Sequence, residues 1–600
     1  MPTACSRRRA LPWSSPRQAV RAGLVAGLVG LFGLLAACGG GGGSSESAAA
    51  PALPLLGAGE SAYEDPAAYS SAANASLSGA VEAAAVTRHS LVLAGTRWDY
   101  TAQAGHLIAR DPVSGAAQAS MFYVAYRADG ANPATRPVTF FYNGGPGSAS
   151  VWLHLGSFGP VRLATGVPAT TASAPFALID NAESLLDTTD LVFVNAVSTG
   201  LSQAISPYTN LSFWGVDADA ALFRDFINRW LAVQQRASSP KFLYGESYGG
   251  PRTAVLARLL QSAGVMLDGL VLQSPALDYN SNCGIGASGS CQGNLPSYAA
   301  IGAWFGLARP APSNIDAYMG DLRTFAASRY APAVAAFLRG TPVPADLPPL
   351  LAGYTGIVAA TWQQRLNLGP DEFRGGLLPA ALIGRYDGRM SAPLGSALAA
   401  DGDPSNTFIA PSFASAIGPY LQNTLRYSTV STYVVSSTAI NQWNFSHQGR
   451  PLPDTVPDLA TALAQNPALR VLAVNGYHDL ATPFHVTELD LARLGTQPRV
   501  QVRDYPGGHM SYLDDATRVR QKADLAAFYR NTLALRASLA EANLPLAVRP
   551  APAADRAGVV PVKPEAATAE PALQTPLRDP WVPPAVARAA AAAAAAEAAR

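Results

Sequence analysis

A serine between two glycines, with an apolar stretch before it and a helical pattern after it, restricts the fold of this chain more than any other feature. The motif Gly245-Glu246-Ser247-Tyr248-Gly249 follows the apolar run Phe242–Gly245 and precedes the helix-like run RTAVLARLLQSA. The glycines permit a tight strand-to-helix turn that lifts the serine side chain out, and the helix start aims backbone N–H groups at the same point. The motif therefore indicates an α/β fold with Ser247 as a candidate nucleophile.

Further short apolar runs of strand type surround this motif. Continuous apolar strands that alternate with helical patterns, such as 218–233, indicate a buried and mostly parallel sheet. Residues 91–126 alternate instead and carry turn signals, which predicts an antiparallel start to the sheet. The strand-like runs are 138–142, 191–195, 242–245, 270–272, 471–475 and 500–503.

These patterns predict the α/β-hydrolase fold, with a mostly parallel central sheet and a helical or irregular insertion that forms a cap. The 49% of hydrophobic residues can bury a large core, and the formal net charge of +1 gives no electrostatic reason to expect nucleic acid as a partner. The predicted parts are a signal peptide (1–37), a flexible tether (38–84), the first part of the core (85–279), the insertion (280–425), the second part of the core (426–540) and a disordered Ala/Pro-rich tail (541–600).

The N-terminus has the pattern of an export signal. Arginines precede an apolar run at 22–37, which is shorter than the about 20 residues that a bilayer span requires. The run ends in Leu35-Ala36-Ala37-Cys38, which resembles a bacterial lipoprotein signal, in which the cysteine carries lipid after cleavage. We expect an exported, periplasmic or cell-envelope protein that meets the membrane only through lipid on Cys38. Ordinary secretion of a soluble product is the alternative.

Two further cysteines, Cys283 and Cys291, lie close together in a Gly/Ser-rich stretch. In an oxidising compartment we expect them to form a disulfide that closes a small loop. A metal site would need more ligands, and no histidine is near. The sequence also contains no H-E-x-x-H pair, which disfavours a zinc peptidase. No metal and no organic cofactor is implied.

A serine hydroxyl is a weak nucleophile and needs a base, and α/β-hydrolases place the acid and then the histidine after the serine in the chain. His509 follows the strand-like VQVR in a glycine-flanked loop, from which an imidazole can reach across the sheet. Asp479 follows VLAVN and is the predicted acid, which would orient and stabilise the imidazolium. Three other histidines follow Ser247: we interpret His478 and His485 as structural or supporting residues and His447 as a packing residue.

Three stretches together resemble the serine carboxypeptidase family, the carboxypeptidase Y-like peptidases. They are Asn143-Gly144-Gly145-Pro146-Gly147-Ser148, Gly245-Glu246-Ser247-Tyr248-Gly249-Gly250, and the paired loops of Asp479 and His509. The resemblance covers residues 85–540, and the run 140–160 looks like the bacterial branch of the family.

The resemblance implies a role for each matching position. Ser247, Asp479 and His509 would form the catalytic triad, the N–H groups of Gly145 and Tyr248 the oxyanion hole, and Asn143, the N–H of Gly144 and Glu246 the site that grips the terminal carboxylate of a substrate. A neutral glutamic acid and an asparagine amide can both donate hydrogen bonds to a carboxylate, whereas an ionised glutamate would repel it.

Some positions depart from the family pattern. Well-studied members have a second glutamate paired with the one before the nucleophile, and that position is Ser157 here. Ser148 and Phe141 stand where the family often has cysteine and tryptophan. Two carboxyls that share a site raise an apparent pKa, and this coupling is absent when one of them is serine. We therefore predict a weaker preference for acidic pH than the family shows.

The expected function is that of a serine-type carboxypeptidase that acts on peptides with a free C-terminus. An esterase or acyltransferase with the same triad is the first alternative, because the carboxylate pocket is altered. A catalytically idle cell-surface binding protein on a hydrolase scaffold is the second. We expect the choice of C-terminal residue to depend largely on side chains of the 280–425 insertion.

Overall fold

A sheet of ten strands forms the centre of the described chain. The computed structural model describes residues 53, 55–171, 174–283 and 289–541. The chain divides into two units, Met1–Pro54 and Leu55–Arg600, and every helix and strand given below belongs to the second. The predicted signal peptide, Cys38 and the predicted tail beyond residue 541 lie outside the described residues.

The strand order is β16-β15-β11-β10-β5-β8-β4-β3-β2, with β9 paired to β4. Strands from β8 to β16 along this order pair in parallel, whereas β4, β3 and β2 pair antiparallel. The predicted mostly parallel sheet with an antiparallel start is confirmed, and the fold is that of an α/β-hydrolase. The strands of the sheet are β2 (Ala83–Leu93), β3 (Thr96–Arg110), β4 (Ala117–Ala128), β5 (Val138–Tyr142), β8 (Asp190–Val194), β9 (Gln203–Ala204), β10 (Lys241–Glu246), β11 (Gly269–Gln273), β15 (Arg470–Gly476) and β16 (Val500–Tyr505).

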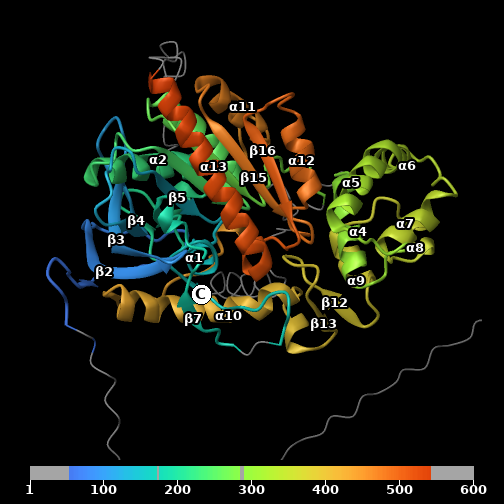
Figure 1. Ribbon diagram of the computed structural model, residues 1–600, viewed down its shortest axis with the longest axis horizontal. Coiled ribbons are helices and arrows are strands. Elements are labelled where there is room, and N and C mark those ends of the chain that lie inside the picture. The colour runs from blue at the N-terminus through green and yellow to red at the C-terminus, as the bar shows by residue number, and fades with distance from the viewer. Residues whose placement is uncertain (1–52, 54, 172–173, 284–288, 542–600) are drawn as a thin grey trace, which may run out of the picture. The chain divides into compact units, whose positions relative to one another are not determined.

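Alternate residues of the central strands enter two different apolar layers. In β5, Phe140 packs with the layer that holds α2 (Val216–Val233), α3 (Gly249–Ser262) and α11 (Val456–Gln465), while Phe141 packs with α1 (Val151–Gly156), α10 (Pro404–Pro419) and α13 (Asp515–Glu541). Figure 1 shows α13 running beside β15 and β16, and its Tyr529 stacks on Phe242 of β10. Both faces are covered, which explains why β5 is apolar without alternation.

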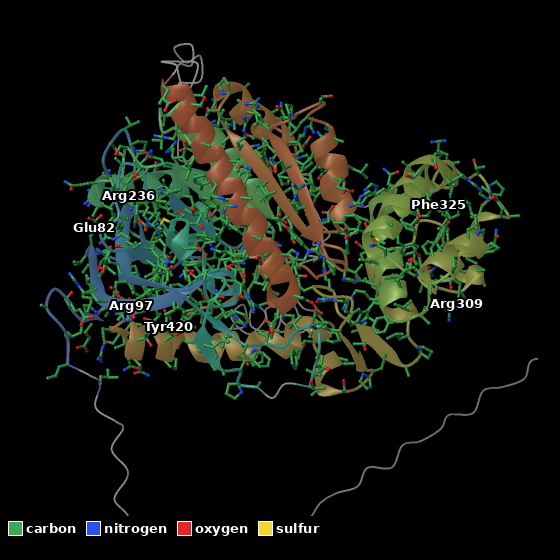
Figure 2. All side chains as sticks on the ribbon, in the orientation of Figure 1. Glu82, Arg97, Arg236, Arg309, Phe325 and Tyr420 are labelled. Atoms are coloured by element: carbon green, nitrogen blue, oxygen red, sulfur yellow. A yellow bond between two sulfur atoms is a disulfide. The ribbon has the colours of Figure 1, made fainter. Side chains whose placement is uncertain are left out.

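The long connection between β11 and β15 forms the insertion. Six of its helices share an apolar core of their own and form the group at the side of the sheet in Figure 1. Phe325 and Arg309 lie in this group, whereas Tyr420 lies beside α10 (Figure 2). The six helices are α4 (Leu295–Trp304), α5 (Ile315–Phe325), α6 (Ala331–Phe337), α7 (Leu347–Thr355), α8 (Ala359–Gln364) and α9 (Pro370–Gly376).

The predicted end of the insertion at residue 425 does not match the structure, because α10 lies before this residue and already packs on the layer that holds Phe141. The strands β12 (Ala381–Ile383) and β13 (Ser391–Pro393) pair with each other, and β14 (Tyr427–Thr429) pairs with β1 (Tyr63–Asp65) outside the central sheet. The first later element that packs on the sheet is α11, followed by α12 (Phe484–Ala492) after β15. The small pair β6 (Val161–Leu163) and β7 (Leu178–Asp180) completes the strands.

The prediction of a flexible tether over 38–84 is wrong for its second half. Asp65 of β1 is 3% exposed and accepts hydrogen bonds from the hydroxyls of Tyr69 (2.9 Å) and Tyr427 (2.6 Å). The Asn210 amide donates to the carbonyls of Ser70 and Ala72. The composition of this segment led to the wrong prediction because small Ala and Ser residues are as common in a closely packed segment as in a linker. Residues 38–52 and 54 lie outside the described residues.

Over the described ranges 53, 55–171, 174–283 and 289–541, no helix has both the length and the hydrophobicity that crossing a bilayer requires.

Candidate active site

Ser247 occupies the sharp turn between β10 and α3. Its φ is +65°, which a side-chain-bearing residue rarely adopts. Its amide donates to the Gln273 carbonyl (2.9 Å) and its carbonyl accepts from the Gly250 amide (2.8 Å), so both neighbours hold the turn. A Cβ on Gly245 would lie 2.2 Å from the Gly249 carbonyl oxygen, which explains why the turn needs glycine there. This geometry matches the strand–turn–helix elbow expected for a nucleophile.

His509 and Asp479 are in direct contact. Nδ1 of His509 lies 2.8 Å from Oδ2 of Asp479, and both side chains are buried. Burial alone would lower the pKa of His509, but the Asp479 charge and hydrogen bond outweigh burial and raise it. Oδ1 of Asp479 accepts from the amides of Ala481 (2.7 Å) and Thr482 (3.0 Å). The carboxylate is therefore fixed in orientation and can stabilise an imidazolium.

The end of β11 joins the histidine loop to the serine turn. The Ser274 hydroxyl donates to the His509 carbonyl (2.7 Å), and Ser274 directly follows Gln273, which accepts from the Ser247 amide. The insertion also holds this loop, because the His509 amide donates to the Tyr386 carbonyl (2.6 Å) and the two rings lie 5.1 Å apart. The residues expected as nucleophile, acid and base thus belong to one connected site.

Thr482 is a supporting residue that the sequence interpretation missed. Its hydroxyl lies 2.8 Å from Oδ2 of Asp479, 2.9 Å from the Ser274 carbonyl and 3.0 Å from Nδ1 of His509. It therefore contacts both members of the histidine–aspartate pair. The available signal was a hydroxyl residue three positions after the candidate acid.

The Asn143–Ser148 loop approaches the serine turn very closely. A Cβ on Gly144 would lie 2.4 Å from the Tyr248 nitrogen, so only glycine fits at this position. Gly145 has a φ of +100°, and among the described residues neither the Gly145 amide nor the Tyr248 amide donates to another group of the chain. Two available N–H groups beside a nucleophile are what an oxyanion hole requires.

Glu246, directly before Ser247, is a buried carboxyl group held by two neutral donors. The Asn143 amide donates to Oε1 (2.7 Å) and the Tyr512 hydroxyl donates to Oε2 (2.7 Å). Burial raises the pKa of Glu246 to about 7. The group is thus substantially protonated at neutral pH and can donate a hydrogen bond. Tyr512 was not identified from the sequence, and no spacing rule would have found it.

Ser157, which the family resemblance aligns with a second glutamate, takes no part in this cluster. Its hydroxyl donates to the Leu153 carbonyl (2.6 Å) at the end of α1, and its carbonyl accepts from the Asn181 amide (2.8 Å). It therefore closes the helix instead of contacting Glu246.

The other three histidines that follow Ser247 in the chain make contacts of their own. The interpretation of His447 as a packing residue is wrong, because its ring nitrogens bond to Asp217 and Asp458, each at 2.8 Å. Both carboxylates lie near helix starts, and Asp217 is 230 positions away, which local sequence could not show. His485 bonds to Glu488 (2.6 Å). His478 is buried, and its ring meets Trp304 edge-on with the ring centroids 6.2 Å apart.

Cys283 and Cys291 are joined by a disulfide, with their Cα atoms 4.9 Å apart, as the sequence predicted.

A small and mostly apolar cavity lies beside His509. Its lining comes mostly from the insertion and from the residues that follow His509. It is lined by Val167, Tyr386, Met390, Ile409, Met510 and Leu513, with smaller polar contributions from other residues. Tyr386, which lines this cavity, also packs on the His509 ring, so the insertion borders the site.

Comparison with known proteins finds similarity over the part of the chain that contains Ser247. Residues 95–283 match the family model for serine carboxypeptidases. Serine carboxypeptidase-like 16 and 33 of Arabidopsis thaliana are each 27% identical, over 169 residues (27% of this chain, 38% of the relative) and 178 residues (26% and 34%). The chain therefore spans well under half the length of these relatives.

Among solved structures, the prohormone-processing carboxypeptidase Kex1 of Saccharomyces cerevisiae is 15% identical with a TM-score of 0.45, over 72% of this chain and 91% of that chain. Proline iminopeptidase of Mycobacterium smegmatis is also 15% identical, with a TM-score of 0.27 over 74% and 99%.

The sheet and the serine turn define an α/β-hydrolase. Within that class, residues 95–283 are similar to serine carboxypeptidases.

Proposed function

We propose that this chain is a serine carboxypeptidase that releases the last amino acid of a peptide through an acyl-enzyme on Ser247. The observation that carries the proposal is the buried Glu246 carboxyl beside the nucleophile, held by Asn143 and with its pKa raised by burial to about 7. A neutral carboxyl at this place suits recognition of a substrate carboxylate, which an exopeptidase of this kind must bind.

The first half of the reaction transfers the acyl group to the enzyme. Oγ of Ser247 attacks the last peptide carbonyl while Nε2 of His509 accepts the hydroxyl proton, and Asp479 stabilises the imidazolium. The N–H groups of Gly145 and Tyr248 hold the negative oxygen of the tetrahedral intermediate. The intermediate collapses as His509 gives its proton to the leaving amine, which departs as a free amino acid.

In the second half, water attacks the ester on Ser247. His509 accepts the water proton and returns it to the serine oxygen as the ester bond breaks. The shortened peptide leaves with a new carboxylate, and the enzyme regains its starting state. Asn143, the Gly144 N–H and Glu246 would bind the terminal carboxylate of the substrate, so that only the last peptide bond reaches Ser247.

The test compares three substrates with the same blocked dipeptide: the free acid, its C-terminal amide and its ester, with Ser247→Ala as the control. The proposal predicts release from the free acid at least about tenfold faster than from the amide, and none from the variant. Ester cleavage alone, still dependent on Ser247, would support the esterase or acyltransferase alternative. Failure of an active-site serine reagent to label Ser247 would support the idle binding protein.

We also propose, from the N-terminal sequence alone, that the protein is exported and carries lipid on Cys38. The test is detergent phase partitioning of the full chain expressed in a bacterium, compared with Cys38→Ser. Lipidation predicts that the natural protein enters the detergent phase and that the variant stays in the aqueous phase. Equal partitioning into the aqueous phase would instead indicate ordinary secretion.

A further inference from the structure

Three buried side chains form a compact polar cluster next to the nucleophile. Asn143 and Glu246 are each 3% exposed and Tyr512 is fully buried. The amide of Asn143 and the hydroxyl of Tyr512 donate to different oxygens of Glu246, each at 2.7 Å. Both oxygens of the carboxyl are thus held by donors that carry no charge.

Tyr512 reaches Glu246 from the loop that also carries His509. It lies in the short helix η8 (Ser511–Leu513), and the Ser511 hydroxyl anchors this turn to Gln521 of α13 (3.1 Å). The ring packs edge-on against Phe158 and leaves no room at Gly156, where a Cβ would lie 3.1 Å from a ring carbon of Tyr512. The hydroxyl is therefore held in place by packing on several sides.

The charged and titratable groups that face Glu246 come from four segments. They are His509 after β16, Asp479 after β15, Tyr512 in η8 and Tyr244 on β10 itself. Burial raises the pKa of Glu246, whereas the His509 charge and the hydrogen bonds from Tyr512 and Asn143 lower it. Among the described residues, no acidic side chain forms a hydrogen bond with Glu246. The Tyr512 hydroxyl is the side-chain donor to Oε2 of Glu246.

We propose that Tyr512 is a positioning residue, whose hydroxyl holds the Glu246 carboxyl in the orientation that receives the terminal carboxylate of a substrate and sets the upper pH limit for binding it. This proposal rests on the proposed carboxypeptidase function. Its physical basis is that a phenol donor stabilises the ionised carboxyl without adding a second negative charge to the site. Without the hydroxyl, the carboxyl gains rotational freedom and keeps its proton to a higher pH.

The experiment uses the full chain and Tyr512→Phe, with Tyr529→Phe as the matched control. Tyr529 is also fully buried and its hydroxyl also bonds to one side chain, that of Thr139 (2.8 Å), but it lies on α13 away from Glu246. KM and kcat are measured between pH 5 and 9 for the blocked dipeptide acid and its ester. Tyr512→Phe is expected to raise KM for the acid about five- to tenfold at pH 5.5 and to move the alkaline rise in KM to higher pH. The ester KM and the Tyr529→Phe values should stay within about twofold of the natural protein.

A second readout does not depend on activity. Difference infrared spectroscopy follows the protonated carboxyl of Glu246, assigned by its loss in Glu246→Gln. The proposal requires a higher titration midpoint in Tyr512→Phe and an unchanged one in Tyr529→Phe. An unchanged midpoint in Tyr512→Phe would overturn it, as would a KM increase shared by the acid and the ester, which indicates a merely structural residue.

Two further measurements keep the outcome decisive. In the Glu246→Gln background, Tyr512→Phe must produce no additional pH shift, and a remaining shift would contradict the proposal. If Tyr512→Phe does not fold, Gly156→Ala displaces the ring while keeping the hydroxyl and must shift the infrared midpoint in the same direction by less. If the natural protein cleaves the free acid no better than the amide, the proposed function is refuted. The infrared midpoint would still test the contact between Tyr512 and Glu246.

Discussion

The guanidinium group of Arg323 lies 2.8 Å from the carboxylate of Asp504. Arg323 belongs to the insertion helix α5, and Asp504 lies at the end of β16, just before the loop of His509. The same guanidinium also contacts Glu488 of α12 (2.8 Å). One arginine therefore joins the insertion to two elements of the catalytic core.

Arg323→Met should destabilise the protein because it removes the guanidinium group that Glu488 and Asp504, two neighbouring and mostly buried carboxyl groups, share. We expect a loss of about 2 kcal/mol in the free energy of unfolding, below the range for fully buried pairs because solvent reaches this one. Urea unfolding at pH 7 measures it, with Arg329→Met as the control, since Arg329 and Asp346 form an exposed pair. Equal effects of the two substitutions would contradict this role of Arg323.

Asp479→Asn should reduce kcat for ester cleavage by about 10⁴-fold, because the imidazolium of His509 loses its charge partner. Thr482→Val should cost about tenfold, because Asp479 keeps its two backbone donors and loses only the hydroxyl contact. Steady-state ester hydrolysis, with Ser247→Ala as the background rate, measures both. A Thr482→Val enzyme as slow as Asp479→Asn would mean that the hydroxyl, rather than the backbone amides, orients the acid.

The free-acid substrate should bind more weakly as the pH rises through about 7. Below that value Glu246 is protonated and donates to the substrate carboxylate, and above it the ionised Glu246 repels the substrate. KM for the acid should rise about tenfold for each pH unit above the pKa, while KM for the ester stays level. Glu246→Gln keeps a donor without a titrating proton and should flatten the profile. A persistent rise in this variant would assign the titration to another group.

His447 should stabilise the protein most at acidic to neutral pH. Burial alone would lower its pKa, but the bonds to Asp217 and Asp458 outweigh burial and raise it to about 9. Because the folded pKa exceeds the unfolded one, the stabilisation is complete below about pH 6.5 and is lost as the pH rises through about 9. We expect His447→Gln to cost about 2 kcal/mol at pH 6 and much less at pH 10, as measured by urea unfolding. A cost independent of pH would show that packing, not charge, explains the residue.

Asp65→Asn tests whether the segment before β2 belongs to the fold. Burial alone would raise the pKa of Asp65, but hydrogen bonds from His106 and Tyr427 outweigh it and lower the pKa to about 2. A lowered carboxyl pKa stabilises the protein above about pH 4, and this contribution is lost as the pH falls towards 2. We expect a loss of about 2 kcal/mol at pH 7 in thermal or urea unfolding. No change at pH 7 would indicate that residues 55–82 are dispensable for stability.

Sequence patterns predicted the fold where the physical signal is local. Residues of β5 and β8 are apolar on both faces because helices cover both sides, so continuous apolar runs mark them correctly. The serine turn was predictable because the backbone at Gly245 and Gly249 comes so close that a Cβ on Gly245 would clash with the Gly249 carbonyl oxygen. The contacts of the serine turn join residues that are close in the chain, whereas the apolar runs mark burial without indicating which helices cover the strands.

The errors concern contacts between distant segments. Tyr512 and Glu246 are separated by 266 positions, and the partners of His447 include Asp217 at 230 positions. The sequence around Tyr512 does not indicate Glu246 as its partner, and the sequence around His447 does not indicate Asp217. The segment 55–84 was assigned to a tether for the same reason, since the partner strand of β1 is β14, at residues 427–429.

The placement of His509 and Tyr512 on one short loop has an evolutionary consequence. In the proposed mechanism the proton carrier His509 and the positioning residue Tyr512 are three residues apart along the chain, so an insertion or deletion between them would alter turnover and substrate choice together. Substitutions in the insertion, whose Tyr386 packs on His509, would instead leave the residues of this loop unchanged. New specificities would then arise by exchange of side chains in the insertion while the loop of His509 and Tyr512 is inherited unchanged.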